Sequence, residues 1–209
     1  MPRSMLRSMS QPLTIALALV LMLAPVAAIA GDFVHPYDFP QHDDAPNTFY
    51  AAIEIPAGGF TKYEIDKKTG HIMVDRFVRM PVAYPANYGF VTQSMGGDGD
   101  PLDVLVITRA PLHPGVLIKV RPIAVLKTLD GGEVDDKIVA VPVTKLDPTY
   151  ESIKDVGDLP EQDRQRFEAF FRVYKQMKSD KVIEIKDWAG VAEAKKMIKE
   201  ALEAYKTGK

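Results

Sequence analysis

Three aspartates lie close together in one short stretch of the sequence, GGDGDPLDVL at residues 96–105. Asp98, Asp100 and Asp103 stand within six positions of one another and immediately precede an apolar run. A turn alone would account for one or two of them, because aspartate, glycine and proline all suit loops. Three crowded carboxylates repel one another unless cations neutralise them, so this spacing favours a divalent cation site.

An EF-hand loop is the first alternative, and the spacing excludes it. With Asp98 as loop position one, the sixth position is Asp103 instead of glycine, and the twelfth is Arg109 instead of glutamate. The sequence also lacks helical patterns on both sides of the segment, which an EF-hand requires. The aspartates therefore indicate a cation site of another kind.

A second acidic turn, LDGGEVDDK at residues 129–137, lies between two expected strands. If both turns meet at one end of the fold, five or more carboxylates converge there. Oxygen-only ligand sets select hard cations such as Mg²⁺, Mn²⁺ or Ca²⁺. Several such cations need further oxygens, and a phosphate group would supply them. The acidic residues of this turn are Asp130, Glu133, Asp135 and Asp136.

Basic and phenolic side chains beside these acidic segments are candidate phosphate ligands. Each has an ordinary structural explanation as well: a surface lysine, an Arg76–Asp75 ion pair, or a tyrosine in the core. No single one of them decides between the two explanations. The candidates are Lys62, Arg76, Tyr84, Tyr88, Lys137, Tyr174 and Lys175.

Short β-type segments dominate residues 49–143. At residues 61–66, Lys62 and Glu64 share one face and Tyr63 and Ile65 the other, which is the alternation of a half-buried strand. Pro122 predicts a bulge or an edge in the long segment 115–127. At least six strands separated by turns predict a closed or nearly closed antiparallel barrel. The expected strands are 49–56, 61–66, 72–77, 103–108, 115–127 and 137–143.

The last third of the chain reads as mainly helical. Residues 158–177 predict a helix with Asp158 as its N-cap and Pro160 in its first turn. Its apolar stripe comprises Phe167, Phe170, Phe171 and Tyr174. Residues 181–188 could form another strand, and residues 190–206 predict an amphipathic helix. The fold class is therefore α+β, mainly β, with a barrel flanked by helices.

The first thirty residues differ from the rest. Arg3 and Arg7 precede an apolar run that is interrupted by Pro25 and ends in the small residues of Ala28-Ile29-Ala30. This pattern predicts a secretory signal peptide cleaved after Ala30, and hence a periplasmic or secreted protein. A retained membrane anchor is the alternative. Residues 31–48 predict an extended arm, and residues 49–209 one domain. In the arm, the loose spacing of the two histidines, His35 and His42, disfavours a metal site.

Composition restricts the function further. The 209-residue chain contains no cysteine, which excludes thiol catalysis and cysteine zinc sites. Removing the two leader arginines from 26 basic residues leaves 24 against 28 acidic ones, a net charge of −4. This balance disfavours an OB-like module that binds nucleic acid. A calcium-binding structural domain and a hydrolase of nucleotides or polyphosphate stay as alternatives.

The chain resembles the soluble inorganic pyrophosphatases of the single-domain, magnesium-dependent family, family I. The segment Asp98-Gly-Asp-Pro-Leu-Asp103-Val is similar to that family's signature. Seven further motifs follow the family's order and spacing, and the resemblance covers residues 49 to 205. These motifs are IEIP, TKYEID, VDRF, YPANYGF, GEVDDKIVAVP, IKDVGDLP and FFRVYK.

The resemblance implies a five-stranded OB-like barrel and the hydrolysis of pyrophosphate to two orthophosphates by a metal-activated water. It implies several Mg²⁺ ions per site, with Mn²⁺ as a possible substitute, and a homohexamer. No nucleic acid is expected as a partner, and no membrane once the leader is cleaved.

The same resemblance implies roles for individual residues. Asp100 corresponds to the general base. Glu54 and Tyr84 correspond to supporting groups. The implied metal ligands are Asp98, Asp103, Asp130, Asp135 and Glu64, with Asp103 bridging two metals. The implied phosphate ligands are Lys62, Arg76, Tyr88, Lys137, Tyr174 and Lys175.

This sequence departs from the family's pattern at the second acidic turn. Gly131 and Gly132 follow Asp130, where some members carry an acid directly after the aspartate. The leader also sets the chain apart from most bacterial members, which are cytoplasmic, and the arm has no counterpart in the family's motifs. We therefore expect a changed metal environment around Asp130.

Overall fold

The structure is a computed structural model, and it describes residues 33–177 and 182–208 of the chain. The predicted signal peptide, residues 1–30, lies outside these described residues. Among the helices of the described residues, none is long and apolar enough to cross a membrane.

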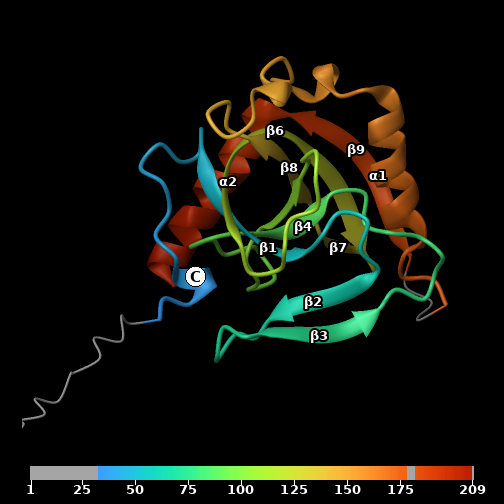
Figure 1. Ribbon diagram of the computed structural model, residues 1–209, viewed down its shortest axis with the longest axis horizontal. Helices are drawn as coiled ribbons and strands as arrows, with labels where there is room; N and C mark the ends of the chain where they lie inside the picture. Colours follow the sequence, from blue (N-terminus) through green and yellow to red (C-terminus); the bar gives the residue numbers. More distant parts are fainter. Residues whose placement is uncertain (1–32, 178–181, 209) are drawn as a thin grey trace, which may run out of the picture. The chain divides into compact units, whose positions relative to one another are not determined.

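The described residues form one main sheet, a separate hairpin and two α-helices (Figure 1). The helices are α1 (Glu161–Val173) and α2 (Val191–Thr207). The strands are β1 (Phe49–Ile55), β2 (Thr61–Ile65), β3 (Ile72–Phe77), β4 (Asn87–Val91), β5 (Asp103–Val106), β6 (Leu117–Asp130), β7 (Glu133–Val134), β8 (Lys137–Pro142) and β9 (Ile183–Gly190).

Five strands of the main sheet form a hydrogen-bonded ring, and Figure 1 looks into it. The order is β1-β4-β5-β8-β6, and pairing between β6 and β1 returns to the first strand. This closure confirms the predicted five-stranded OB-like barrel. One detail of the prediction is wrong: β5 and β8 run parallel, with Val104 beside Ile138, so the barrel is not antiparallel throughout.

Strand β4 was not predicted from the sequence. It follows Pro85 and contains Asn87 and Gly89, residues that are uncommon in strands. Gly89 pairs with Ile53 of β1, and a Cβ atom at position 89 would lie 1.9 Å from the carbonyl oxygen of Ala52. The glycine is therefore needed because two backbones approach too closely for any side chain.

Strand β6 extends beyond the barrel. Its pairing with β8 shifts register between Pro122 and Ala124, which confirms the predicted bulge. Its far half pairs with β9, and a two-residue turn at Gly131 and Gly132 leads into β7. Both glycines have positive φ, +62° and +93°, as a tight hairpin turn requires. This turn holds Asp130 and Glu133 as directly opposed neighbours.

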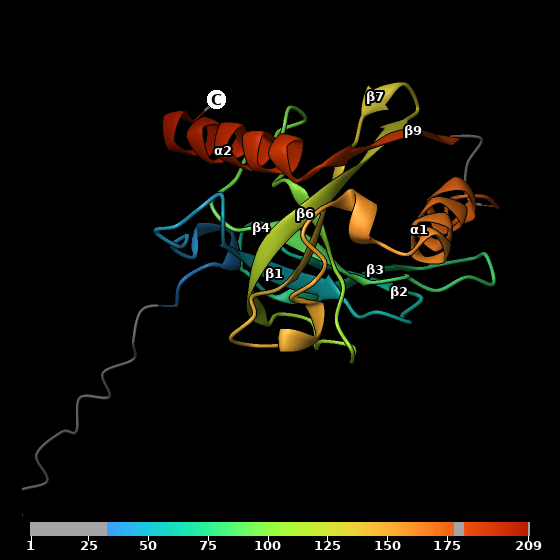
Figure 2. The ribbon, with the colours of Figure 1, turned by 90° about the horizontal axis from the view of Figure 1, so that it is seen from above.

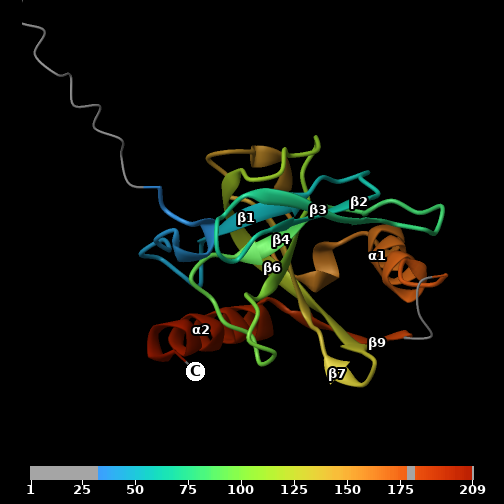
Figure 3. The same ribbon diagram turned by 90° about the horizontal axis from the view of Figure 1, so that it is seen from below.

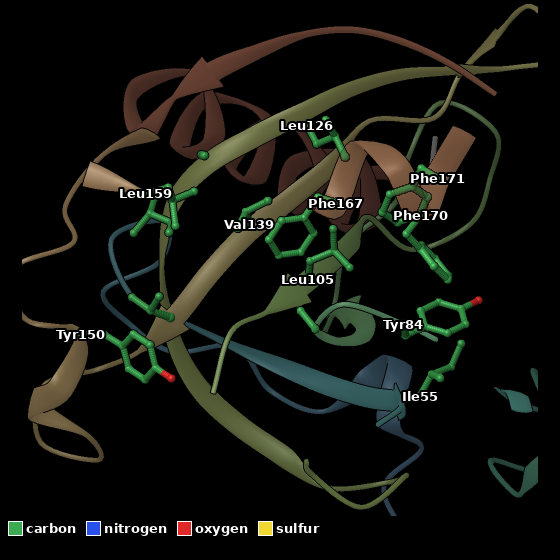
Figure 4. Close-up of a cluster of buried hydrophobic side chains, with 14 of the residues drawn as sticks. Ile55, Tyr84, Leu105, Leu126, Val139, Tyr150, Leu159, Phe167, Phe170 and Phe171 are labelled. Carbon is green, nitrogen blue, oxygen red and sulfur yellow. The ribbon is translucent and has the colours of Figure 1, made fainter. Parts of the chain in front are cut away.

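Helix α1 begins later than its sequence pattern predicted. Pro160 stands at its N-cap position, and Asp158 is not the cap. Asp158 instead ends the short 3₁₀ helix η3 (Val156–Asp158), where its carboxylate accepts hydrogen bonds from the backbone N–H groups of Lys154 and Asp155. The predicted apolar stripe is confirmed, because Phe167, Phe170 and Phe171 are buried against one end of the barrel core (Figure 4).

Helix α2 buries a face of small and branched side chains on the barrel. Ala194, Ile198 and Ala201 are buried with residues of β1, β5 and β6. Figures 2 and 3 show the two helices on separate sides of the ring. The pattern of residues 190–206 predicted this amphipathic helix correctly, since the helix spans Val191–Thr207 and buries one face.

Strands β2 and β3 form a two-stranded sheet of their own. Lys62 pairs with Arg76 across the hairpin, and a register shift follows Lys62. The hairpin runs beside β1, on the outside of the ring (Figure 3). It therefore carries two of the predicted phosphate ligands without belonging to the main sheet.

The described part of the arm, residues 33–48, packs on the barrel and is not simply extended. It contains the 3₁₀ helix η1 (Pro36–Asp38) and a turn. The side chain of Gln41 connects the arm to the barrel. Its Nε2 donates to the Tyr50 carbonyl at 3.1 Å and to the Thr92 carbonyl, and its Oε1 accepts from Tyr50 N at 2.6 Å. Both histidines are partly buried and make hydrogen bonds within the protein.

Candidate active site

All fourteen residues that the sequence analysis selected line one cavity of about 740 Å³. They come from β1, the β2–β3 hairpin, β4 and the segment before it, the aspartate loop with β5, the segment from the end of β6 to the start of β8, and the residues that follow α1. They are Glu54, Lys62, Glu64, Arg76, Tyr84, Tyr88, Asp98, Asp100, Asp103, Asp130, Asp135, Lys137, Tyr174 and Lys175.

The aspartate loop holds its carboxylates at different depths. Asp98 and Asp100 lie on a turn that is closed by a 2.6 Å hydrogen bond from Gly96 N to the Asp100 carbonyl. The Asp98 carboxylate accepts from Asp100 N at 3.0 Å. Asp103 is the first residue of β5 and is only partly exposed. Asp103 is thus fixed by a barrel strand, whereas Asp98 and Asp100 lie on the loop that precedes this strand.

Lys137 lies at the bottom of the site, between two carboxylates. It is 1% exposed, and its ammonium group contacts Asp103 at 2.5 Å and also pairs with Asp135. Burial opposes its charge, but the two carboxylates outweigh burial and raise the pKa of Lys137 above its usual value. Burial raises the pKa of Asp135, and Lys137 partly offsets this. Lys137 therefore stays charged and holds together the carboxylates of Asp103, at the start of β5, and Asp135, just before β8.

Asp130 has one carboxylate oxygen paired and one free. Oδ2 accepts from Lys175, whereas Oδ1 is buried without a hydrogen-bond partner in the described residues. An unpaired buried carboxylate oxygen is costly unless a cation completes its environment. The Lys175 ammonium also lies 5.5 Å from the centroid of the Tyr174 ring. This arrangement fits a metal ligand better than it fits a structural ion pair.

The hairpin presents its charges in pairs. Lys62 contacts Glu64 and lies 3.3 Å from Asp75, and Arg76 donates to Asp75 at 2.5 Å. The Arg76–Asp75 pair was the structural alternative for this arginine, and it forms while Arg76 also lines the cavity. Both explanations of Arg76 are therefore compatible with the geometry.

Glu54 lies behind the hairpin and is almost wholly buried, with 8% of its surface exposed. Its carboxylate accepts a 2.8 Å hydrogen bond from Ile65 N. Burial is the largest influence and raises the pKa of Glu54 to about 7, although the Ile65 hydrogen bond lowers it. Glu54 thus titrates near neutral pH and joins β1 to the end of β2.

Tyrosines close the wall of the cavity toward α1. Tyr84 packs against Tyr88, Phe170 and Tyr174, with ring centroids 5.6, 4.6 and 6.1 Å apart. Tyr88 donates a hydrogen bond to Asp103. Burial, with Asp103 contributing, raises the pKa values of Tyr88 and Tyr174 well above their usual value. Both hydroxyls therefore stay protonated and are available as neutral donors.

Two further residues of the cavity were missed by the sequence analysis. Lys67 pairs with Asp100, and this hydrogen bond raises the pKa of Lys67. Its position directly after the TKYEID strand was the available clue. Tyr37 of the arm also lines the cavity. No motif indicated Tyr37, because its proximity depends on how the arm folds back.

Most of the acidic side chains of the cavity pair with lysines, and they do not converge on one point. In residues 33–177 and 182–208, no group of three or more acidic or histidine side chains stands ready to hold a metal ion. The charged lining nevertheless offers many carboxylate oxygens as ligands, including the unpaired Asp130 Oδ1. Such donors suit hard divalent cations, and the lysines suit a polyanion that enters with them. The site can thus bind a substrate carrying anionic oxygens and divalent ions.

Comparison with known proteins gives a consistent result. A family model described as inorganic pyrophosphatase matches residues 51–206. An inorganic pyrophosphatase of Aquifex pyrophilus is 46% identical over 171 residues, which are 82% of this chain and 97% of that protein. An inorganic pyrophosphatase of Nanoarchaeum equitans is 48% identical over 157 residues, which are 75% of this chain and 97% of that protein.

Solved structures agree with the sequence matches. The inorganic pyrophosphatase of Thermus thermophilus superposes with a TM-score of 0.79 at 34% identity, covering 83% of this chain and 99% of that one. The structure of a protein from Anaplasma phagocytophilum, described as an inorganic phosphatase, superposes with a TM-score of 0.78 at 40% sequence identity. The match covers 81% of this chain and 99% of that one.

Proposed function

This chain belongs to the inorganic pyrophosphatase family and hydrolyses pyrophosphate to two orthophosphates, and from this premise we propose how its cavity performs the reaction. The enzyme is metal-dependent, and we propose Mg²⁺ as the physiological metal, with Mn²⁺ as a substitute. The observation that supports this most is the common lining of one cavity by carboxylates and by lysines. Mg²⁺ prefers carboxylate and phosphate oxygens together.

The metal ligands in this proposal are carboxylates of the aspartate loop, β5, the β6–β8 turn and the hairpin. The unpaired Asp130 Oδ1 and the raised pKa of Asp135 both indicate carboxylates that a cation would stabilise. When bound, divalent cations neutralise pyrophosphate and lower the pKa of the attacking water from about 16 toward 7. The proposed ligands are Asp98, Asp103, Asp130, Asp135 and Glu64, with Glu54 in support.

Asp100 is the proposed general base. It lies on the exposed loop at the cavity, and its partner Lys67 is a flexible side chain that is 62% exposed. An exposed ion pair contributes little free energy, so Lys67 is readily displaced from Asp100. The freed carboxylate then orients the water and accepts its proton.

The remaining cations and hydroxyls bind the phosphoryl groups. Lys62 and Arg76 approach from the hairpin, and Arg76 offers a planar group suited to bidentate phosphate binding. From the barrel and α1 side come Lys137, Lys175 and the protonated hydroxyls of Tyr88 and Tyr174. Tyr84 supports these two tyrosines by packing against them.

Phosphate release from pyrophosphate tests this proposal directly. The chain from Gly31 onward should release phosphate with Mg²⁺, release it more slowly with Mn²⁺, and release none with EDTA. Equal release with and without divalent cations would refute the metal roles. Faster hydrolysis of ATP or tripolyphosphate than of pyrophosphate would refute the proposed substrate preference.

The leader and the assembly complete the proposal. The pattern of residues 1–30 supports export and cleavage after Ala30, giving a periplasmic or secreted enzyme. Fractionation of cells expressing the full chain tests this, and a full-length product in the membrane fraction would instead indicate a retained anchor. The family resemblance supports a homohexamer, which light scattering of the purified enzyme tests.

A further inference from the structure

The arm contacts the β2–β3 hairpin at the end of β2. The Tyr37 hydroxyl donates a 3.1 Å hydrogen bond to the Ile65 carbonyl. His35 Nε2 lies 3.0 Å from the Asp66 carbonyl oxygen, and its Nδ1 accepts from Tyr37 N at 3.1 Å. A neutral imidazole with its hydrogen on Nε2 makes both bonds of His35 at once. Two adjacent carbonyls of the hairpin are therefore bound by two side chains of the arm.

Tyr37 is itself anchored to the barrel. Its ring packs edge-on against Phe90 of β4, with centroids 4.6 Å apart and planes at 89°. Its carbonyl accepts a 2.7 Å hydrogen bond from Gln93 N. Burial, and next the charge of Glu54, raise the pKa of the Tyr37 hydroxyl, so that it stays protonated and continues to donate. Tyr37 thus connects the barrel to the hairpin.

The hairpin depends on such connections because it forms a separate sheet. No strand ladder joins β2 or β3 to the main sheet in the described residues. At Ile65, the N–H donates to Glu54 of β1 and the carbonyl accepts from Tyr37. The peptide groups that end β2 are therefore held from the barrel on one side and from the arm on the other.

The same hairpin carries much of the charge that faces the substrate. Lys62 and Glu64 lie on β2, Arg76 lies on β3, and Lys67 follows β2 and pairs with Asp100. A small rotation of the hairpin would move these groups together relative to the barrel-borne residues. Misplacement of about 1 Å at a substrate-binding group is enough to weaken binding and catalysis.

We propose that Tyr37 and His35 are positioning residues, which set the hairpin at the distance from the barrel that pyrophosphate binding requires. This inference rests on the proposed function, since it assumes that the hairpin cations bind the phosphoryl groups. It gives the arm a role in substrate affinity that is exerted without contact between Tyr37 or His35 and the reacting atoms.

Tyr37→Phe is the first test, because it removes the hydroxyl and keeps the ring that packs on Phe90. We expect the KM for magnesium pyrophosphate to rise about three- to tenfold, the range that loss of one hydrogen bond produces. We expect kcat to stay within about twofold, because the barrel-borne groups are unchanged. Amide hydrogen exchange of residues 65–72 should become faster.

Tyr205→Phe is the matched control. Tyr205 of α2 donates a hydrogen bond to the Asp38 carboxylate, one residue along the arm from Tyr37. Removing it loosens the arm from α2 and leaves the hairpin contacts in place. KM and the exchange of residues 65–72 should match those of the parent enzyme. Equal changes in both variants would overturn the proposal in favour of a general structural effect.

His35 gives an independent test by rescue. His35→Ala removes the donor to Asp66, and His35→Gln restores an amide donor at nearly the same reach. We expect the alanine variant to raise KM as Tyr37→Phe does, and the glutamine variant to recover most of the loss. Equal KM values in both His35 variants would contradict the positioning role of this residue.

The outcomes separate this inference from the proposed function. If the parent enzyme releases no phosphate with Mg²⁺, the proposed function itself fails. If the parent enzyme is active and Tyr37→Phe leaves KM and hydrogen exchange unchanged, only the positioning role fails. A fall in kcat without a change in KM would likewise contradict it.

Discussion

The floor and the rim of the cavity are built in opposite ways. On the floor, Asp103, Asp135 and Lys137 begin or precede strands of the ring, and their charges are largely withdrawn from water. On the rim, Lys62 and Lys67 belong to a separate hairpin; Lys67 and its partner Asp100 are 62% and 56% exposed, and Glu64, the partner of Lys62, is 50% exposed. The floor is fixed by the barrel, whereas the rim is adjustable.

This difference follows from the electrostatics of the two regions. Buried ion pairs lose much when one partner is removed, because the other charge stays buried and unpaired. Exposed pairs contribute at most about 1 kcal/mol and exchange partners readily. A site that binds divalent ions and a polyanion needs both kinds of region. The floor supplies preformed ligands, and the rim supplies cations that release their carboxylate partners when the substrate enters.

The largest effect is expected on the floor, from Asp103→Ala. Turnover should fall roughly 10⁴-fold, because several kcal/mol of transition-state stabilisation depend on the metal that this ligand would hold. Calorimetric titration with Mg²⁺ should show weakened binding. Glu133→Gln, an exposed carboxylate of the same cavity, is the matched control and should stay within about twofold. Unchanged Mg²⁺ binding in Asp103→Ala would contradict the ligand assignment.

The next effect tests the loop between the two regions. Asp100→Asn should lower kcat about 10²- to 10⁴-fold, the contribution typical of a general base. Mg²⁺ titration should give binding close to that of the parent, because Asp100 is not among the proposed metal ligands. Turnover near the parent's rate would refute its role.

Glu54 links floor and rim, and its titration should be visible in stability. Its pKa is about 7 in the folded enzyme, against 4.5 in the unfolded chain. The neutral carboxyl thus stabilises the fold fully below pH 4.5, and this contribution is lost as pH rises through 7. Relative to Glu54→Gln, the parent should lose about 3 kcal/mol of unfolding free energy over that range.

Urea unfolding of both proteins in EDTA, between pH 4 and 8, would measure this loss. EDTA keeps metal binding from masking the titration. Parallel stability curves for the parent and the glutamine variant would show that Glu54 titrates normally.

The smallest effect is expected on the rim. Arg76→Lys keeps the charge but loses the planar guanidinium, so the KM for magnesium pyrophosphate should rise about tenfold, equal to about 1.4 kcal/mol. Stability should hardly change, because the ion pair that Arg76 makes within the described residues is with the partly exposed Asp75. If the KM of Arg76→Lys equals that of the parent, Arg76 does not bind phosphate, and Lys62 is the phosphate ligand of the rim.

Much of this molecule follows from its sequence alone. The alternation of TKYEID, the bulge at Pro122 and the aromatic stripe of α1 were predictable because each depends on neighbours a few residues away. Crowded charge selected the two acidic turns and the basic and phenolic side chains beside them, whereas Glu54, the metal role of Glu64 and the individual role of each residue came from the resemblance to the pyrophosphatase family. The sequence also determined that the site offers oxygen ligands and no thiols.

Only the tertiary structure decided the rest. Strand β4 forms because the barrel brings Gly89 against Ala52, and no local propensity encodes that contact. The parallel pairing of β5 and β8, the burial of Lys137 and the reach of Tyr37 to Ile65 each join segments that are far apart in the chain. Long-range packing decides which charged side chains are buried in the barrel and which stay exposed on the hairpin. This division gives the site fixed carboxylates and cationic side chains that can change partners.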